Sequence, residues 1–120
     1  MTGAQVSDPV RFHARLPAQM VVGDGTRLTA VATAASTAAL ALPTGAKLLI
    51  VRATGPIAYR FGASGVGAAA VDDNSVLFPP GEAAVAVPVL SGALATHVRV
   101  IRADAEADDY NVQFERVKTV

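Results

Sequence analysis

The sequence predicts an all-β fold: a β-sandwich or jelly-roll-like domain of about 7–8 short antiparallel strands, preceded by an extended N-terminal arm. Three observations support this class. Apolar and polar residues alternate in short segments, most segments end at a turn containing Pro or Gly, and no heptad or internal repeat interrupts the pattern. Several short strands with turn signals between them are typical of sandwiches and jelly rolls. The segments are residues 46–52, 57–62, 76–78, 83–90, 97–103 and 110–117.

The length and composition indicate one globular domain built from small side chains. The chain has 120 residues, of which 52% are hydrophobic and 17% are charged, so it falls outside the disordered class. Aromatic residues make up only 5%, and alanine and valine supply most of the apolar content. Because an alanine methyl group buries little area, we expect a moderately stable domain whose alanine-rich faces pack in part on another subunit.

The charge balance and the absence of cysteine exclude several function classes. Lys+Arg and Asp+Glu number 10 each, and the basic residues form no run, so we expect no nucleic acid as a partner. A net charge of zero favours self-association. Without cysteine, the chain has neither a disulfide framework nor a thiolate nucleophile. No apolar stretch is long enough to span a membrane, and the first residues do not resemble a signal peptide, so we expect no membrane partner.

Residues 1–26 predict an N-terminal arm, and residues 27–120 predict a single β-sandwich domain. Pro and Gly punctuate the first part, in which residues 11–16 alternate polar and apolar side chains without a long hydrophobic run. We expect the arm to lie across the domain or a neighbouring subunit. Its predicted contact residues are Phe12, Leu16 and Met20.

Residues 26–42 carry signals for both helix and strand. The alanines favour a helix, whereas the β-branched residues recur with a period of two, which favours a strand. Because no capping box introduces a helix, we favour the strand. The sequence Pro43-Thr44-Gly45 then predicts a hairpin-like turn at its end.

Alternation assigns the faces of the later strands. In residues 57–62, Ile57, Tyr59 and Phe61 point to one face. In residues 110–117, the even positions up to Phe114 predict a core face, and the odd positions predict a face toward water or a partner. Pro88 interrupts residues 85–90, so this strand is an edge strand or carries a bulge.

The long glycine-rich stretch at residues 62–75 is interpreted as an inter-strand contact loop. Its glycine order does not match a dinucleotide fingerprint, and no Lys-Ser/Thr pair follows it, so we expect no cofactor. Long loops on a rigid scaffold often carry contacts with partners. The predicted interface residues of this loop are Gly62, Ser64, Gly65, Val66, Asp72 and Asp73.

The remaining polar residues form no catalytic or metal-binding constellation. Residues 104–109 contain four acidic side chains but lack the glycine and spacing of a calcium loop, so we interpret them as a solvated hairpin tip, with bound Ca²⁺ as the alternative. His13 and His97 have no further histidine or cysteine at ligand spacing, which argues against zinc. No signature orders a nucleophile, a base and an acid, so we expect no catalytic residue, no enzymatic activity and no small-molecule substrate.

The order of turns and strands over residues 40–117 resembles that of small virion proteins of tailed bacteriophages. The matching pieces are Leu42-Pro43-Thr44-Gly45, Leu49–Pro56, Tyr59-Arg60-Phe61-Gly62, Leu77–Gly81 and Thr96-His97-Val98. The resemblance implies a β-sandwich or jelly-roll protein of the decoration or cement type. Such proteins sit as homotrimers on the outer capsid surface and bridge subunits of the major capsid protein.

We therefore expect a non-enzymatic capsid decoration protein, made in the host cytoplasm and located on the virion. Two alternatives stay open: a receptor- or glycan-binding module of a head or tail fibre, and a structural protein of the neck or tail. Glycan binding usually needs exposed aromatic rings. The chain has no Trp, and alternation places both of its tyrosines, Tyr59 and Tyr110, in the core or an interface.

Overall fold

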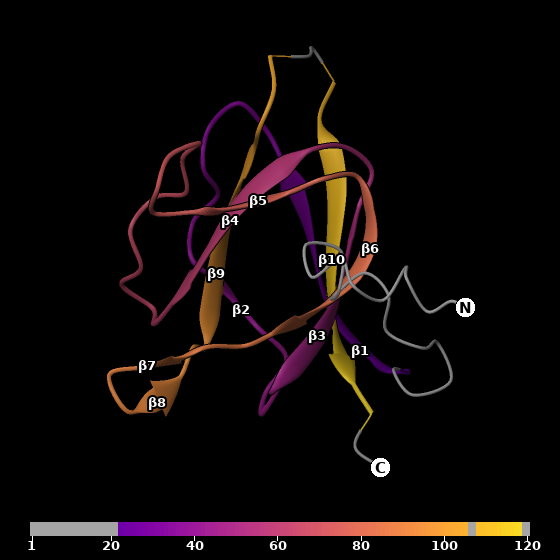
Figure 1. The fold of residues 1–120 in the computed structure, drawn as a ribbon, viewed down its shortest axis with the longest axis vertical. Coiled ribbons are helices and arrows are strands. Elements are labelled where there is room, and N and C mark those ends of the chain that lie inside the picture. Colours follow the sequence, from indigo (N-terminus) through magenta and orange to yellow (C-terminus); the bar gives the residue numbers. More distant parts are fainter. Residues whose placement is uncertain (1–21, 106–107, 119–120) are drawn as a thin grey trace, which may run out of the picture.

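The computed structural model describes residues 22–105 and 108–118, which fold into an all-β, two-layer arrangement (Figure 1). The described residues contain no helix, so the predicted all-β class is confirmed. The strands are β1 (Gly23–Ala32), β2 (Leu40–Ala41), β3 (Leu48–Ala53), β4 (Ile57–Gly62), β5 (Val76–Phe78), β6 (Gly81–Ala86), β7 (Val89–Leu90), β8 (Ala93–Leu94), β9 (His97–Arg102) and β10 (Tyr110–Val117).

Eight of these strands form two antiparallel sheets that pack as a β-sandwich. Sheet A is 4-stranded, with the order β1-β10-β3-β6, and sheet B is 4-stranded, with the order β2-β9-β4-β5. The remaining pair, β7 and β8, makes a separate 2-stranded hairpin. Figure 1 shows this hairpin projecting beyond the body of the sandwich.

The chain passes from one sheet to the other at most of its turns. Among the strands of the two sheets, only β4 and β5 follow each other within one sheet. The turn Pro43-Thr44-Gly45 is closed by a 3.3 Å hydrogen bond from the Ala46 N–H to the Pro43 carbonyl, and Gly45 adopts a φ of 73°. This turn joins β2 of sheet B to β3 of sheet A, so the predicted hairpin there is wrong. Turn chemistry is local, whereas contacts far along the chain decide which strands pair.

The segment with conflicting signals contains a strand, as predicted, although this strand ends early. β1 stops at Ala32, and residues 33–39 form a loop that leads to the short β2. β1 begins at Gly23 and therefore includes the last residues that the sequence assigned to the arm. Residues 1–21, with the predicted contact residues Phe12, Leu16 and Met20, lie outside the described residues.

The core lies between the two sheets and centres on a group of aromatic rings. Tyr59 of β4 is 2% exposed and Phe114 of β10 is 0% exposed, with ring centroids 5.9 Å apart and nearly perpendicular planes. Phe61 and Phe78 also lie against Tyr59, at 5.1 and 6.3 Å. Edge-to-face pairs of this kind add to the burial of each ring. The faces predicted by alternation for β4 and for the core side of β10 are confirmed.

Candidate functional site

The predicted contact loop between β4 and β5 is fastened to the outer face of sheet B. Arg99 of β9 donates from Nε to the Thr37 carbonyl at 2.7 Å and from Nη1 to the Val66 carbonyl at 3.1 Å. The Ala69 N–H donates to Ser36 Oγ at 2.9 Å, and Ala69 is buried. Arg99 and Ser36 therefore hold the loop of residues 33–39 and the loop of residues 63–75 together.

The structure divides the predicted residues of this loop into anchored and exposed positions. Gly62 is buried at the end of β4, where an added Cβ would approach Val66 at 2.6 Å, and Val66 is half-buried. Ser64, Gly65, Asp72 and Asp73 are exposed. The exposed positions remain free to contact a partner, whereas Gly62 and Val66 support the loop from beneath.

The acidic segment between β9 and β10 is tied to a neighbouring arginine. Arg102 donates to the carbonyls of Asp104 and Asp108 at 3.2 and 3.1 Å, and to the Asp109 carboxylate at 3.3 Å. The Asp104 carboxylate accepts a 2.6 Å hydrogen bond from the Tyr110 hydroxyl. In the described part of the chain, no group of three or more His, Cys, Asp or Glu side chains is placed to hold a metal ion. His97 pairs with the Thr96 hydroxyl at 2.8 Å, and His13 lies outside the described residues.

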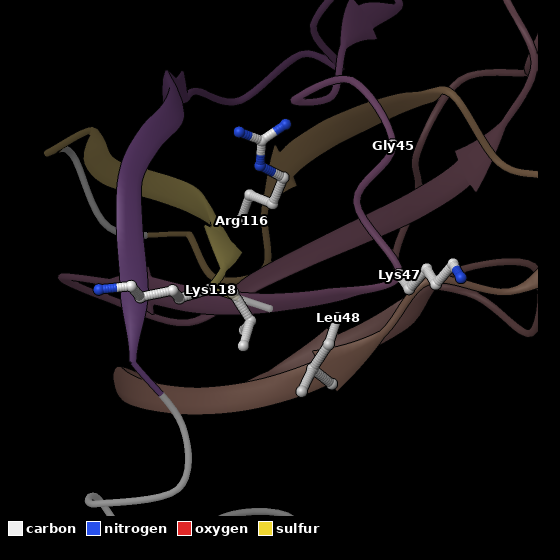
Figure 2. A pocket seen from close by; sticks show the side chains of 6 residues that line it. Gly45, Lys47, Leu48, Arg116 and Lys118 are labelled. Carbon is white, nitrogen blue, oxygen red and sulfur yellow. The ribbon is translucent and has the colours of Figure 1, made fainter. Parts of the chain in front are cut away.

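A cavity of about 260 Å³ lies at the end of the sandwich where β3 begins and β10 ends. Its lining includes Lys47, Arg116 and Lys118. Figure 2 shows that these three side chains point in different directions rather than toward a common centre. Arg116 is already engaged, since it donates to Asp24 Oδ2 at 2.6 Å and to the Thr44 carbonyl at 2.7 Å. The cavity therefore lacks the convergent donors that bind an anion.

Glu115 is the one buried charged residue of the described chain, and it lies on the face of β10 predicted to meet water or a partner. Its carboxylate accepts hydrogen bonds from Arg52 Nη1 at 2.6 Å and from the Gly25 N–H at 2.9 Å. Arg27 Nη2 lies 3.7 Å from the same carboxylate. At this position the sequence expectation of an open face is wrong, because arginines from two neighbouring strands cover the carboxylate.

The backbone of β1 is shaped around Glu115. The register between β1 and β10 shifts between Gly23 and Arg27, and Gly25 within this bulge has a φ of 87°. A Cβ on Gly23 would collide with the Glu115 carboxylate. The Arg52 guanidinium, and after it the Gly25 amide, hold the pKa of Glu115 below its ordinary value of 4.5. This group therefore stays ionised and joins three strands of sheet A.

Four of the exposed large apolar side chains lie in two groups, one on the β7–β8 hairpin and one beside the edge strand β5. Val71 of the second group belongs to the predicted contact loop, and the other three were not predicted as contacts. On the β7–β8 hairpin, Val89 is 64% exposed and Leu90 is 43% exposed. Near the edge strand β5, Val71 is 54% exposed and Leu77 is 61% exposed. The hairpin had a readable signal in Ser91-Gly92, two turn residues between short apolar pairs. The second group had no such signal, because a loop residue and a strand residue meet there.

A groove of about 340 Å³ lies at this second group and has no charged residue in its lining. It opens at the end of the sandwich where β4 begins and β9 ends. The lining residues are Pro56, Ile57, Val71, Leu77, Phe78, Pro79 and Ala103.

Comparisons of the chain with models of protein families, with curated proteins and with solved structures found no match. In the described residues, no helix is long and apolar enough to cross a membrane. The candidate site is therefore defined by geometry alone: an apolar hairpin tip, an apolar groove and the exposed part of an anchored loop.

Proposed function

We propose that this chain is a non-enzymatic structural protein of a phage virion, most simply a capsid decoration or cement protein that bridges subunits of the major capsid protein. The observation that carries the proposal is the placement of exposed apolar side chains on the β7–β8 hairpin and beside β5 of the two-sheet sandwich. Such a sandwich presents surfaces to its neighbours without changing shape. The resemblance of residues 40–117 to small virion proteins supports the same function.

The strand pairing supports a finer assignment of the fold to the jelly-roll class. The pairs β1·β10, β2·β9, β3·β6 and β4·β5 are nested one inside the next along the chain. Nested pairs arise when one long hairpin, with its tip between β4 and β5, is rolled into two layers. Sheets β1-β10-β3-β6 and β2-β9-β4-β5 then follow from the rolling. Jelly rolls of eight strands are common among viral capsid domains.

A cementing function follows from the physical character of these surfaces. Burial of apolar area across the joint between two capsomers favours the joint by about 25 cal/mol per Å² before the entropic and desolvation costs of association are subtracted. A single small contact contributes little, but a decoration protein occupies many equivalent positions on a shell. In this proposal the exposed positions of the loop, including Ser64 and Asp72, and the predicted arm residues such as Phe12 contact the major capsid protein, and the protein acts as a homotrimer on the outer capsid surface.

The test is to compare capsids assembled without this protein with the same capsids after it has been added back. We expect the added protein to bind in a saturable manner and to raise the temperature and the osmotic shock at which packaged DNA is released. A variant with both Asp72→Lys and Asp73→Lys changes the exposed loop, and the matched control Val31→Lys changes an exposed position of β1. Equal resistance of capsids with and without the protein would overturn the cementing function.

The alternatives have weaker support in the geometry. A glycan-binding module needs an accessible aromatic platform, but Tyr59 is buried, and Tyr110 packs over Gly55 and donates to Asp104. Binding of the purified protein to a glycan array would favour that alternative. A neck or tail protein would be found in six or twelve copies at one vertex, and counting copies per virion separates it from a shell protein.

A further inference from the structure

We infer that copies of this chain associate head to tail, with the β7–β8 hairpin of one copy inserted into the apolar groove beside β5 of the next. This inference deepens the homotrimer of the proposed function and rests on that proposal only for the number of copies. Both surfaces lie within the described residues, and each supplies what the other lacks. The hairpin carries unburied apolar side chains, and the groove carries an unfilled apolar lining.

The hairpin has the features of a rigid insertion element. Val89 pairs with Leu94, and Leu90 pairs with Ala93. Ser91 and Gly92 have φ angles of 52° and 88°, which is the geometry of a tight two-residue hairpin turn. At the base, the Ala95 N–H donates to the Pro88 carbonyl at 2.9 Å, and Leu94 packs against the core. The hairpin is thus fastened at its base, and its tip is exposed.

The direction of the side chains favours a groove over a flat partner. Directly paired residues of an antiparallel hairpin point to the same side, and successive residues point to opposite sides. Val89 and Leu90 therefore face opposite sides of the hairpin. The Val89 side also carries Leu94, which packs against the core of its own chain, so a flat surface would cover only the Leu90 side and leave the exposed Val89 uncovered. A groove contacts both sides of an inserted tip. The segment Val89–Leu94 contains no charged residue, which matches the uncharged lining of the groove.

One copy cannot place its hairpin in its own groove. The hairpin joins β9 through Thr96, immediately before the first residue of that strand, and Ala103 of the groove follows the last residue. The six residues of β9 separate the two surfaces by roughly 20 Å at the rise of an extended strand. A hairpin that enters such a groove therefore enters the groove of another copy. A contact between two different surfaces of identical chains is heterologous, and it closes into a ring when the rotation between copies allows it.

The size of the contact favours a closed ring over an isolated pair. With roughly 30 Å² per residue, as in ordinary interfaces, the hairpin and the accessible groove residues bury on the order of 300 Å² together, since Ile57 and Phe78 of the lining are already buried. Stable complexes bury about 1,200 Å² or more, so one contact by itself is weak. In a ring every copy uses both its hairpin and its groove, and loss of one copy breaks two contacts.

Disulfide trapping tests the contact directly, because the chain has no cysteine of its own. Leu90→Cys and Leu77→Cys are made in separate chains, purified, mixed and oxidised mildly, and Val31→Cys replaces Leu77→Cys as the matched exposed control. We expect the Leu90–Leu77 pair of variants to cross-link at least about tenfold faster than the control pair, because the contact raises the effective concentration of the thiols. Equal rates for the two pairs, or fastest linkage of Leu90→Cys to itself, would overturn the head-to-tail contact.

Solution mass provides a second readout that does not depend on a thiol. By light scattering across a concentration series, the wild-type chain should approach a mass of about three times 12.2 kDa. Leu90→Lys and Leu77→Lys should each remain monomeric, with the far-UV circular dichroism of the wild type. A mixture of these two variants retains only one intact hairpin–groove contact per pair of chains, which is weak by itself, so the mixture should also remain largely monomeric. A wild-type chain that is monomeric at every concentration, or variants that assemble like it, would overturn the inference without affecting a capsid contact made by the loop.

Discussion

The buried carboxylate of Glu115 offers a sharp test of what stabilises sheet A. We expect Glu115→Gln to lower the free energy of unfolding by about 2–3 kcal/mol. The carboxylate accepts hydrogen bonds from the Arg52 guanidinium and from the Gly25 amide, and its side chain is only 7% exposed. Glutamine has one acceptor oxygen, and its amide N–H₂ must face either Arg52 or Gly25, both of which are donors. One charge-assisted hydrogen bond is therefore lost, and a donor is left facing a donor.

The loss of stability that is due to burial of Glu115 can be separated from the general effect of removing a negative charge beside Arg52. Arg52 has a second carboxylate partner that is exposed, and this partner can be changed in the same way. Glu82 of β6 contacts Arg52 Nε at 2.5 Å, but its side chain is 58% exposed. Exposed ion pairs contribute little, so Glu82→Gln should cost less than about 0.5 kcal/mol. Urea unfolding followed by far-UV circular dichroism measures both variants. Equal losses in the two variants, or a loss below about 0.5 kcal/mol for Glu115→Gln, would refute the reasoning from burial.

The same residue predicts a pH dependence with a definite sign. Because the folded-state pKa of Glu115 lies below its ordinary value of 4.5, the folded protein binds a proton there less readily than the unfolded chain does. The stabilisation that the ionised Glu115 carboxylate contributes is fully present above its ordinary pKa of 4.5, and it is lost as the pH falls through the lower folded-state pKa. Between about pH 5 and pH 3, the wild type should therefore lose stability more steeply than Glu115→Gln. Parallel pH profiles would contradict this assignment.

Three further predictions concern packing, loop anchoring and tyrosine ionisation. Gly55→Ala should cost about 1–3 kcal/mol in urea unfolding, because a Cβ there would overlap the Tyr110 ring, whereas Gly65→Ala has open space around it and should be nearly neutral. Arg99→Ala should speed amide hydrogen exchange about tenfold or more in the two loops that it joins, with the exchange of β3 and β10 unchanged. Burial raises the pKa of Tyr59 from 10.0 to about 12, so the folded protein retains this proton more tightly. Stability should be lost as the pH rises from about 10 toward 12, and Tyr59→Phe should remove that loss.

Alternation predicted the strands in which one face is buried. In β10, Val112 and Phe114 are 0% exposed, and in β4, Ile57 and Tyr59 are at most 2% exposed, as their period of two indicated. The reason is geometric: a strand places successive side chains on opposite faces, so burial of one face is recorded directly in the sequence. The single strand expected over residues 83–90 was wrong: Pro88 lies in no strand and separates β6, which ends at Ala86, from β7, which begins at Val89.

Alternation did not predict which strands pair, nor which residues form hydrogen bonds and ion pairs with the arginine side chains. Arg52 joins Glu82 and Glu115, which are 30 and 63 positions away along the chain, and nothing local marks these partners. The turn at residues 43–45 has the composition of a hairpin turn, yet it connects two sheets. Arg102 is the exception, because its acidic partners follow within 7 residues and could have been expected from spacing alone.

The same limit of alternation explains why the exposed apolar residues of the β7–β8 hairpin were not predicted as contacts from the sequence. Alternation identifies residues that are buried by a sheet face, and the inner faces of both sheets are filled by the core. Val89 and Leu90 belong to a two-stranded hairpin in which Leu94, on the same side as Val89, packs against the core, yet Val89 and Leu90 themselves stay exposed. An exposed apolar side chain on such a hairpin buries little area within its own chain and so contributes little to the stability of the fold. The proposed head-to-tail contact would bury both side chains and so accounts for this apolar pair, whereas a singly exposed residue such as Val31 needs no partner.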